Sequence, residues 1–219
     1  MTDPGGLDVL EPEKLPQQLE GYLSGVWADG ADVTVSEYEQ ITGGYSRYMA
    51  RFRATAGDKT QRLILRADPP PGQSILDTDR KVEWDLASAL HGGGGVAIPA
   101  PLYFDDGTSL GAPAIVYQEL SGPTMYVTVQ EGEIGDHFGL TEPLADTIAD
   151  VHKVDIDTLP AALERPTSWN DYIAAGAARW ASAEAEHAER DPFMRVISAW
   201  LEANRPAPTD LTLVHGDFQ

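Results

Sequence analysis

Cysteine is absent from the 219-residue chain. This absence excludes disulfide bonds, thiolate metal sites and a cysteine nucleophile, and it is compatible with a reducing compartment. The sequence also lacks any apolar run of about 18 residues, the length that a membrane-spanning helix needs. Its start, MTDPGGLDVLEPEKL, has neither the basic nor the apolar region of a signal peptide. We therefore expect a cytoplasmic protein with no membrane partner.

Basic residues are also scarce. The chain has 15 lysine and arginine residues against 35 aspartate and glutamate residues, a formal net charge of −20. Such a balance argues against a broad basic surface for a phosphate backbone, so we expect no nucleic-acid partner. A solvated acidic surface is the simplest interpretation of the charge. The sequence contains no pattern that specifies an oligomeric state.

Hydrophobic residues make up 42% of the sequence, enough for a sizeable core in one domain or two small lobes. Between Val33 and Leu120, four short runs are rich in β-branched or aromatic residues, which is typical of strands. Turn residues such as TGGYS and AGDK separate these runs. The predicted strands are residues 33–38, 48–54, 62–67 and 113–120.

The segment TDRKVEWDLASAL predicts one helix between the third and fourth of these strands. Asp77 is its expected N-cap, and Val82, Leu86 and Leu90 recur at the spacing of one helix face. Four consecutive glycines, residues 92–95, follow and should end the helix. Because they follow a helix and do not open one, we interpret them as a connection, not as a phosphate-binding loop.

After Gly122 the periodicity becomes helical. Segments 142–152, 169–188 and 191–204 each place apolar residues at helix spacing. We expect the first and third of these helices to pack into one core. The buried side of the middle helix is expected to consist of Trp169, Tyr172, Ile173 and Trp180. The RPAPTD segment then stops the last helix, and LTLVHGDFQ is interpreted as a strand that leads into a polar loop.

This order of parts indicates an α+β fold. It resembles the aminoglycoside phosphotransferase and choline kinase-like family of small-molecule kinases, which has a bilobal protein-kinase-like fold. LVHGDFQ is similar to the family's HGDxxxxN catalytic loop, ITGGYSRYMARFRA to its first hairpin, RLILRADPPPG to its third strand and DRKVEWDLASAL to its inserted helix. VAIPAPLYFDDGTSLGAPAIVYQELSG is similar to the stretch that leads into the linker between the lobes. The resemblance is strongest to kinases related to the amino-terminal domains of certain acyl-CoA dehydrogenases.

The resemblance implies an N-terminal nucleotide-binding lobe, residues 1–120, and a partial helical C-terminal lobe, residues 121–219. In the loop of the second lobe, Asp217 would be the catalytic base that accepts the substrate hydroxyl proton, and His215 would brace the loop. Gly216 would permit the tight backbone between them. Taken alone, Asp217 is better interpreted as a turn-capping residue after a strand.

The resemblance also implies a nucleotide site in the first lobe. The family pairs a lysine of the third strand with a glutamate of the inserted helix, and the matching residues here are Arg66 and Glu83. Arginine keeps the positive charge and can hold a carboxylate or phosphate with two hydrogen bonds. Taken alone, these two residues could be ordinary solvated charges, and the Gly-rich segment an ordinary hairpin turn. The implied cofactor-binding residues are Gly43, Gly44 and Ser46 over the phosphates, Arg66 and Glu83 as the pair, and Gln118, Glu119 and Leu120 in the linker.

The implied cofactors are ATP and Mg²⁺, and the implied partner is a small molecule with a hydroxyl group, either aminoglycoside-like or a metabolic alcohol. The family's metal ligands follow the catalytic loop, so we expect them beyond residue 219 and predict no metal ligand within the chain. The chain is then expected to be an N-terminal fragment, inactive alone, that exposes apolar surface. The alternative is a non-catalytic nucleotide-binding or interaction protein with a kinase-like fold.

Overall fold

The computed structural model describes residues 11–27, 30–41, 47–68, 79–122, 137–187 and 192–216. The chain divides into two compact units, Met1–Pro160 and Ala161–Gln219, and each is described by itself. The boundary between two lobes at residue 120 stays a prediction. Within the described residues, no helix is long and apolar enough to cross a membrane.

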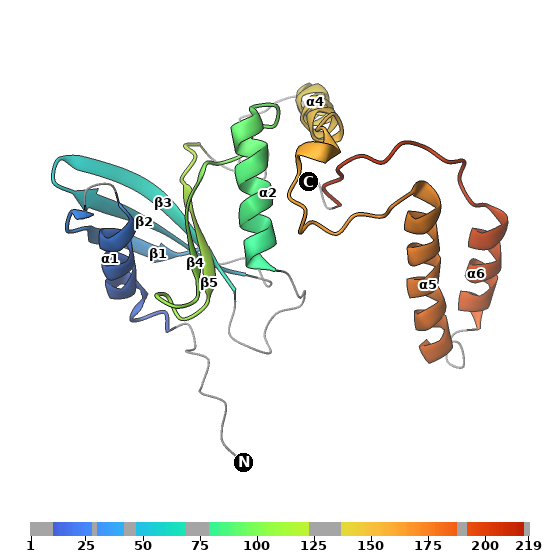
Figure 1. Cartoon of the computed structure of the whole chain (residues 1–219), viewed down its shortest axis with the longest axis horizontal. Helices are drawn as coiled ribbons and strands as arrows, with labels where there is room; N and C mark the ends of the chain where they lie inside the picture. Colours follow the sequence, from blue (N-terminus) through green and yellow to red (C-terminus); the bar gives the residue numbers. More distant parts are fainter. Residues whose placement is uncertain are drawn as a thin grey trace, which may run out of the picture. The chain divides into compact units, whose positions relative to one another are not determined.

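The elements are labelled in Figure 1. The first unit contains α1 (Leu15–Val26), β1 (Thr34–Gln40), β2 (Tyr48–Ala56), β3 (Lys59–Ala67), α2 (Arg80–Gly93), β4 (Pro101–Asp106), β5 (Pro113–Gln118), the 3₁₀ helix η2 (His137–Leu140), α4 (Thr141–His152) and the 3₁₀ helix η3 (Ile156–Thr158). The second unit contains α5 (Trp169–His187) and α6 (Phe193–Ala203). The α+β class expected from the sequence is confirmed.

The described strands form one antiparallel sheet in the order β1-β2-β3-β5-β4. Strands β1, β2, β3 and β5 confirm the four predicted runs, with slightly different ends. Strand β4 was not predicted because its sequence, PLYFDD, does not alternate apolar and polar residues. The reason is that both of its faces are covered. Tyr103 stacks on Trp27 at the end of α1 with ring centroids 6.4 Å apart, and the next residue, Phe104, packs against Trp84 of α2 at 5.9 Å.

Because successive strand residues point to opposite faces, these two ring contacts place α1 and α2 on opposite sides of the sheet, as Figure 1 shows. Helix α1 was not predicted, although Leu15, Leu19 and Leu23 recur at helix spacing and are fully buried. They join one hydrophobic cluster with alternate residues of the strands. The fully or nearly fully buried strand residues of that cluster are Ala50, Phe52, Ala54, Leu63, Leu65, Ala67, Ala114 and Val116.

Helix α1 also occupies hydrogen-bonding groups at the edge of the sheet. The backbone N–H of Val35 in β1 donates to Glu20 Oε1 at 2.9 Å, and that of Val33 donates to Ser24 Oγ at 2.9 Å. Both acceptors are side chains of α1. Unpaired groups on an edge strand attract other chains, so these two bonds cover part of the β1 edge as well as orienting the helix.

Helix α2 begins two residues later than the sequence analysis placed its cap. The N-cap is Asp79, whose carboxylate accepts hydrogen bonds from the backbone N–H groups two and three residues further on. The prediction of Asp77 as N-cap is therefore wrong, and Asp77 itself lies outside the described residues. Aspartate stands at both 77 and 79, so residue type alone does not distinguish the two positions. The cap is the aspartate that directly precedes the first helical residue, Arg80. Gly94 ends the helix in the left-handed conformation, φ 68°, which confirms the role of the glycine run.

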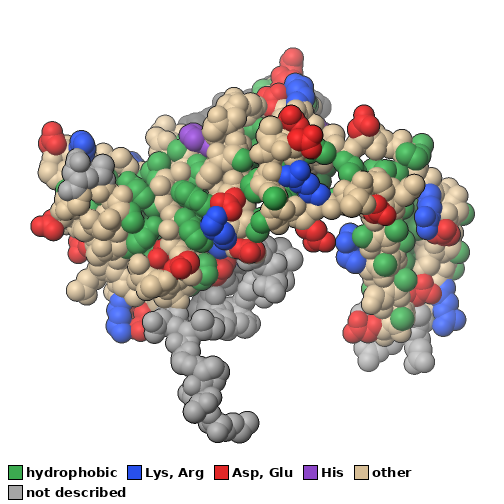
Figure 2. All heavy atoms as spheres, in the orientation of Figure 1, with side chains coloured by type: hydrophobic (Ala, Val, Ile, Leu, Met, Phe, Trp, Pro, Cys, Tyr) green, Lys and Arg blue, Asp and Glu red, His purple; other side chains and the backbone are tan. Residues whose placement is uncertain are grey.

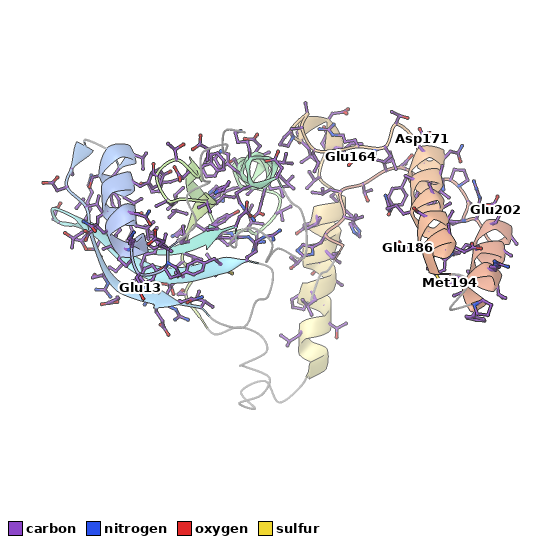
Figure 3. All side chains as sticks on the ribbon, turned by 90° about the horizontal axis from the view of Figure 1, so that it is seen from below. Glu13, Glu164, Asp171, Glu186, Met194 and Glu202 are labelled. Carbon is purple, nitrogen blue, oxygen red and sulfur yellow. The ribbon has the colours of Figure 1, made fainter. Side chains whose placement is uncertain are left out.

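Helix α4 confirms the predicted segment 142–152. In the second unit, α5 and α6 run side by side in opposite directions. Figure 3 shows this course, with Asp171 and Glu202 toward one end of the pair and Glu186 and Met194 toward the other. These helices confirm the two later helical segments of the sequence analysis.

The packing of these two helices differs in part from the sequence analysis. Tyr172 of α5 is 46% exposed, so its assignment to a buried side is wrong. Helices α4 and α6 belong to different units, so the core that they were expected to share stays a prediction. Phe193, Val196 and Trp200 of α6 are each about 60% exposed. The physical reason is that a pair of helices has a single interface, which cannot cover the whole apolar circumference of α6. The structure therefore exposes apolar surface in this unit.

The segment before the His-Gly-Asp motif does not form the predicted strand. Residues 206–215 have no regular secondary structure, and Val214 is 59% exposed. An apolar-alternating segment becomes a strand only when a neighbouring strand supplies hydrogen-bonding partners, and the described part of this unit consists of helices and connecting segments.

Candidate functional site

A cavity of about 680 Å³ opens on the α2 side of the sheet in the first unit. Strands β2, β3 and β5, helix α2 and the segment after β5 all contribute to its walls. Its apolar lining consists of Ile41, Met49, Ile64, Leu86, Ala87, Leu90, Ile98, Pro99, Tyr117 and Leu120. Its charged lining consists of Arg51, Arg66, Glu83 and Glu119. This volume is in the range of cavities that bind small molecules and cofactors.

The local sequence explains why the cavity has one apolar wall. In β2 and β3, alternate residues face the α1 core, which leaves Met49 and Ile64 on the opposite face. Leu86 and Leu90 were predicted to lie on one face of α2, and they do, but that face lines the cavity and both residues are only half-buried. An apolar stripe on a helix can therefore mark a cavity wall as well as a core.

Arg66 and Glu83, which the sequence analysis pairs, are in direct contact. Arg66 Nε of β3 lies 2.8 Å from Glu83 Oε1 of α2. The Nε–H bond is not aligned with that oxygen, so the contact is an ion pair and not a hydrogen bond. The Arg66 side chain is 36% exposed and that of Glu83 is 27% exposed, so a ligand in the cavity has access to the pair.

Glu83 has two further partners that the sequence analysis did not identify. The buried guanidinium of Arg80 donates from Nη1 to Glu83 Oε2, and it donates from Nη2 to Asp68 Oδ1 just after β3. The Tyr117 hydroxyl donates to Glu83 Oε1 at 3.4 Å. Burial, with the Glu83 charge adding to it, raises the pKa of the Tyr117 hydroxyl to about 12, so this group stays protonated and remains a donor.

Arg47 adds a third guanidinium near this cluster. Burial lowers its pKa, and the positive charge of Arg80 lowers it further. Arg66 and Arg80 balance the formal charges of Asp68 and Glu83. One sequence signal could have identified Arg80, since it stands three residues before Glu83 on a helix, a spacing that brings two side chains together. No local sequence pattern indicated Asp68, because it lies 12 residues before Arg80 in the chain.

The predicted linker follows β5. Glu119 and Leu120 line the cavity together with Gln118. Two backbone donors of the linker are already used, because Gln118 N–H donates to Ala100 O at 2.9 Å and Glu119 N–H donates to Arg62 O at 3.0 Å. Within the described part of the linker, the backbone N–H groups not used in this way begin at Leu120.

Four predicted site residues, Gly43, Gly44, Ser46 and Asp217, lie outside the described residues. His215 is described, exposed and in the second unit. Gly216 has φ 81°, the left-handed conformation that glycine adopts without strain. The roles of these residues stay predictions.

Comparison with known proteins identifies the family of this chain. The family model "Phosphotransferase enzyme family" matches residues 37–219. The chain belongs to this family. The matched region begins within β1 and includes the cavity, the Arg66–Glu83 pair and the His-Gly-Asp segment.

The fold of this phosphotransferase-family chain is also found in solved structures. Two structures of the GDP complex of aminoglycoside 2'-phosphotransferase-IIIa, one of a mutant and one of the wild type, align with TM-scores of 0.52 and 0.50. Each is 13% identical in sequence, and the alignment covers 87% of this chain. The chain spans 59% of the length of those structures. No curated protein matches the sequence. At this identity the likeness shows the kinase-like fold, as expected from the sequence.

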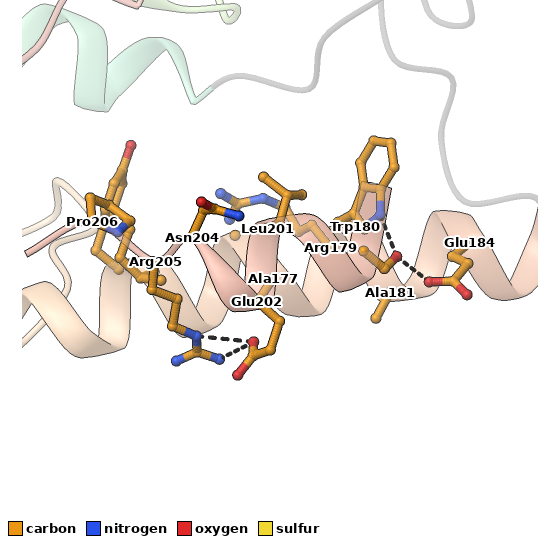
Figure 4. A pocket seen from close by; sticks show the side chains of 14 residues that line it. Ala177, Arg179, Trp180, Ala181, Glu184, Leu201, Glu202, Asn204, Arg205 and Pro206 are labelled. Carbon is orange, nitrogen blue, oxygen red and sulfur yellow. Dashed lines mark hydrogen bonds and ion pairs between the residues drawn. The ribbon is translucent and has the colours of Figure 1, made fainter. Parts of the chain in front are cut away.

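A second hollow, of about 420 Å³, lies along the α5–α6 pair of this phosphotransferase-family chain (Figure 4). There the Trp180 Nε1–H donates to Ser198 Oγ at 2.7 Å, and the Ser198 hydroxyl donates to Glu184 Oε2. Arg205 and Glu202 form an ion pair at 2.7 Å on its rim. The hydrogen bonds of Ser198 connect α5 with α6, whereas the Arg205–Glu202 pair is local to the end of α6.

Among the residues that the structure describes, no group of three or more histidine, cysteine, aspartate or glutamate side chains is close enough to hold a metal ion. The described part of the family fold therefore assigns no residue to Mg²⁺.

Proposed function

We propose that this chain is the nucleotide-binding part of an ATP-dependent phosphotransferase that transfers the γ-phosphate to a hydroxyl group of a small molecule. The observation that carries the proposal is the cavity of the first unit. It combines an apolar wall with an ion pair at Arg66 and Glu83, inside a region that matches the phosphotransferase enzyme family.

The cavity residues fit a nucleotide. An aromatic base has apolar faces and a polar edge, and the leucine and isoleucine side chains of the lining supply contacts for the faces. The edge would meet the linker, where Leu120 is the first residue whose backbone N–H is not already donated to Ala100 or Arg62. Arg66 would hold phosphate oxygens, and Glu83 would keep its guanidinium in place.

The charge distribution also supports an anionic ligand at this face. Acidic side chains are scattered over the surface (Figure 2), in agreement with the net charge of −20. Against that background, strand pairing puts Arg51, Arg53, Arg62 and Arg66 on one face of β2 and β3, because Arg53 lies opposite Arg62 and the others alternate with buried residues. Each of these arginines is paired with one glutamate, so this face lacks the acidic excess of the chain as a whole and repels a polyphosphate less than that net charge alone would.

The transfer itself is assigned to the His-Gly-Asp loop. ATP supplies the phosphoryl group, whose bond to the ADP oxygen breaks as the bond to the acceptor oxygen forms. Asp217 would take the proton of the acceptor hydroxyl, and His215 would brace the loop. Gly43, Gly44 and Ser46 would cover the phosphates through backbone N–H groups. We propose Mg²⁺ as the metal, and an aminoglycoside-like compound or a metabolic alcohol as the acceptor.

Calorimetric titration of the 219-residue chain with ADP tests the nucleotide site. We expect the wild type to bind ADP, and Arg66→Met to weaken binding by about tenfold, since it removes one charge-assisted contact to phosphate. Arg53→Met is the matched control, because Arg53 has nearly the same exposure on the same sheet face but is paired with Glu37 outside the cavity. Equal losses in the two variants, or no ADP binding by the wild type, would contradict the proposed site.

The same protein tests whether these residues suffice for turnover. Because the described residues offer no metal site, we propose that the 219-residue chain binds nucleotide without transferring phosphate at ordinary kinase rates. A coupled assay for ADP release with Mg²⁺ and a panel of aminoglycosides and simple alcohols measures this. Sustained turnover would show that the chain carries its own metal ligands among residues that the structure does not describe.

A further inference from the structure

Arg80 is the most deeply buried charged residue among those that the structure describes. It is 2% exposed, at the first position of α2, yet it lies beside a cavity that is open to ligands. A buried guanidinium is costly unless carboxylates and hydrogen bonds compensate its charge. Here Asp68 and Glu83 do so, one from the end of β3 and one from α2.

The two oxygens of the Glu83 carboxylate contact different partners. Its Oε2 receives the hydrogen bond from Arg80, and its Oε1 faces Arg66 and Tyr117. Because Arg80 is also joined to Asp68, it connects the end of β3 to the start of α2. The position of the carboxylate that meets Arg66 is therefore determined by a buried group that does not itself line the cavity.

The formal charges of these side chains show how Arg80 affects the binding of a phosphate. If Glu83 and Asp68 faced Arg66 alone, two negative charges would oppose one positive charge, and a phosphate would be repelled. The buried Arg80 compensates one of them, so the four charges sum to zero and the cluster no longer repels an anion, while Glu83 still orients Arg66.

We infer that Arg80 is a positioning residue for phosphate recognition, acting through Glu83 to hold Arg66 over the cavity. This inference rests on the proposed nucleotide site. At that site the base of the ligand would lie against the apolar wall and its phosphates would lie at Arg66. Binding of the base and binding of the phosphates can therefore be tested separately. Loss of Arg80 should then affect binding of ADP but not of adenosine.

The experiment measures dissociation constants for ADP and adenosine by calorimetry on the full 219-residue chain. We expect Arg80→Met to weaken ADP by about tenfold, the value of one charge-assisted contact, and to leave adenosine within about twofold. Arg205→Met is the control, since Arg205 is also paired with a nearby glutamate but belongs to the second unit. Equal loss of both ligands in Arg80→Met would indicate a general structural role and would overturn the inference.

A double-mutant cycle distinguishes positioning from an independent effect. If Arg80 acts through Arg66, adding Arg80→Met to Arg66→Met should change the ADP dissociation constant by less than about twofold. Additive losses would overturn the inference. A wild type that binds neither ligand would instead overturn the proposed function.

Folding of the variants is checked by thermal unfolding. If Arg80→Met does not fold, Arg80→Lys replaces it in both measurements, because lysine keeps the charge but presents no planar fork that reaches two carboxylates. Selective loss of ADP binding in Arg80→Lys supports the inference, and wild-type ADP binding overturns it.

Discussion

The Arg62 guanidinium holds the Glu119 carboxylate with two hydrogen bonds, from Nε at 2.7 Å and from Nη2 at 3.1 Å. The two residues are 57 positions apart, one on β3 and one just after β5. Their backbones are also joined, since Glu119 N–H donates to Arg62 O. The segment that follows β5 is therefore fastened to the sheet at the mouth of the candidate nucleotide cavity.

This pair and the Arg80 pair predict a rank order of stability. Arg62 is 61% exposed and its removal leaves one carboxylate, Glu119, without its partner, whereas Arg80 is buried and its removal leaves two partly buried carboxylates without theirs. We expect Arg62→Met to lower the urea midpoint less than Arg80→Met does. The reverse order in urea unfolding would be inconsistent with the burial of these groups.

Helix α1 should be required for the stability of the sheet. Leu19 is fully buried against the strands, so Leu19→Ala is expected to lower the free energy of unfolding by about 2–4 kcal/mol, from lost burial and the remaining cavity. Val26→Ala on the same helix is the control, because Val26 is 43% exposed and should cost much less. Urea unfolding of both variants measures the difference, and similar values would argue against the packing of α1.

The glycine run at the end of α2 predicts opposite effects at two neighbouring positions. Gly92 lies within the helix with nothing within 4 Å of an added Cβ, so Gly92→Ala should stabilise the protein by roughly 0.5–1 kcal/mol. Gly94 has the left-handed conformation, so Gly94→Ala should destabilise it by about 1 kcal/mol. Thermal unfolding compares the two. Changes of the same sign would mean that the helix does not end at Gly94.

The Tyr117 hydroxyl predicts a loss of stability at high pH. Burial raises its pKa from 10.0 to about 12, so the folded state holds the proton more tightly than the unfolded state. The resulting stability is complete below about pH 10 and is lost as the pH rises toward 12. We expect Tyr117→Phe to show a smaller decline in the free energy of unfolding between pH 9.5 and 11, about the range in which the unfolded tyrosine ionises. An equal decline in wild type and variant would assign the effect to other groups.

The exposed apolar residues of α6 predict small effects on stability and a measurable effect on dye binding. Trp200 is 61% exposed, so Trp200→Gln should change the free energy of unfolding by less than about 0.5 kcal/mol. It should reduce the fluorescence of a dye that binds exposed apolar surface. Arg195→Gln on the same helix is the control. A large destabilisation by Trp200→Gln would show that this face is covered in solution.

Local sequence patterns were sufficient where neighbouring residues decide the structure. Four strands, helix α4 and the end of α2 at Gly94 followed from alternation, helix spacing and glycine conformation, which act over a few residues. The order of these parts, with the LVHGDFQ motif, was also sufficient to identify the phosphotransferase family, because the order of helices and strands along a chain is characteristic of its fold. The pairing of Arg66 with Glu83 was foreseen from that resemblance, not from either residue alone.

The tertiary structure decided what depends on distant partners. Strand β4 is apolar on both faces because α1 and α2 cover it from opposite sides, and its sequence therefore lacks the alternation of a half-exposed strand. The segment at 211–215 has that alternation, but the described residues of its unit offer no partner strand. The spacing of three residues on a helix indicates a pair of Arg80 with Glu83, but only the approach of β3 and α2 adds Asp68 and buries the Arg80 guanidinium. The burial of a side chain and the compensation of its charge depend on all the residues near it in space. For these residues, those neighbours come from different helices and strands.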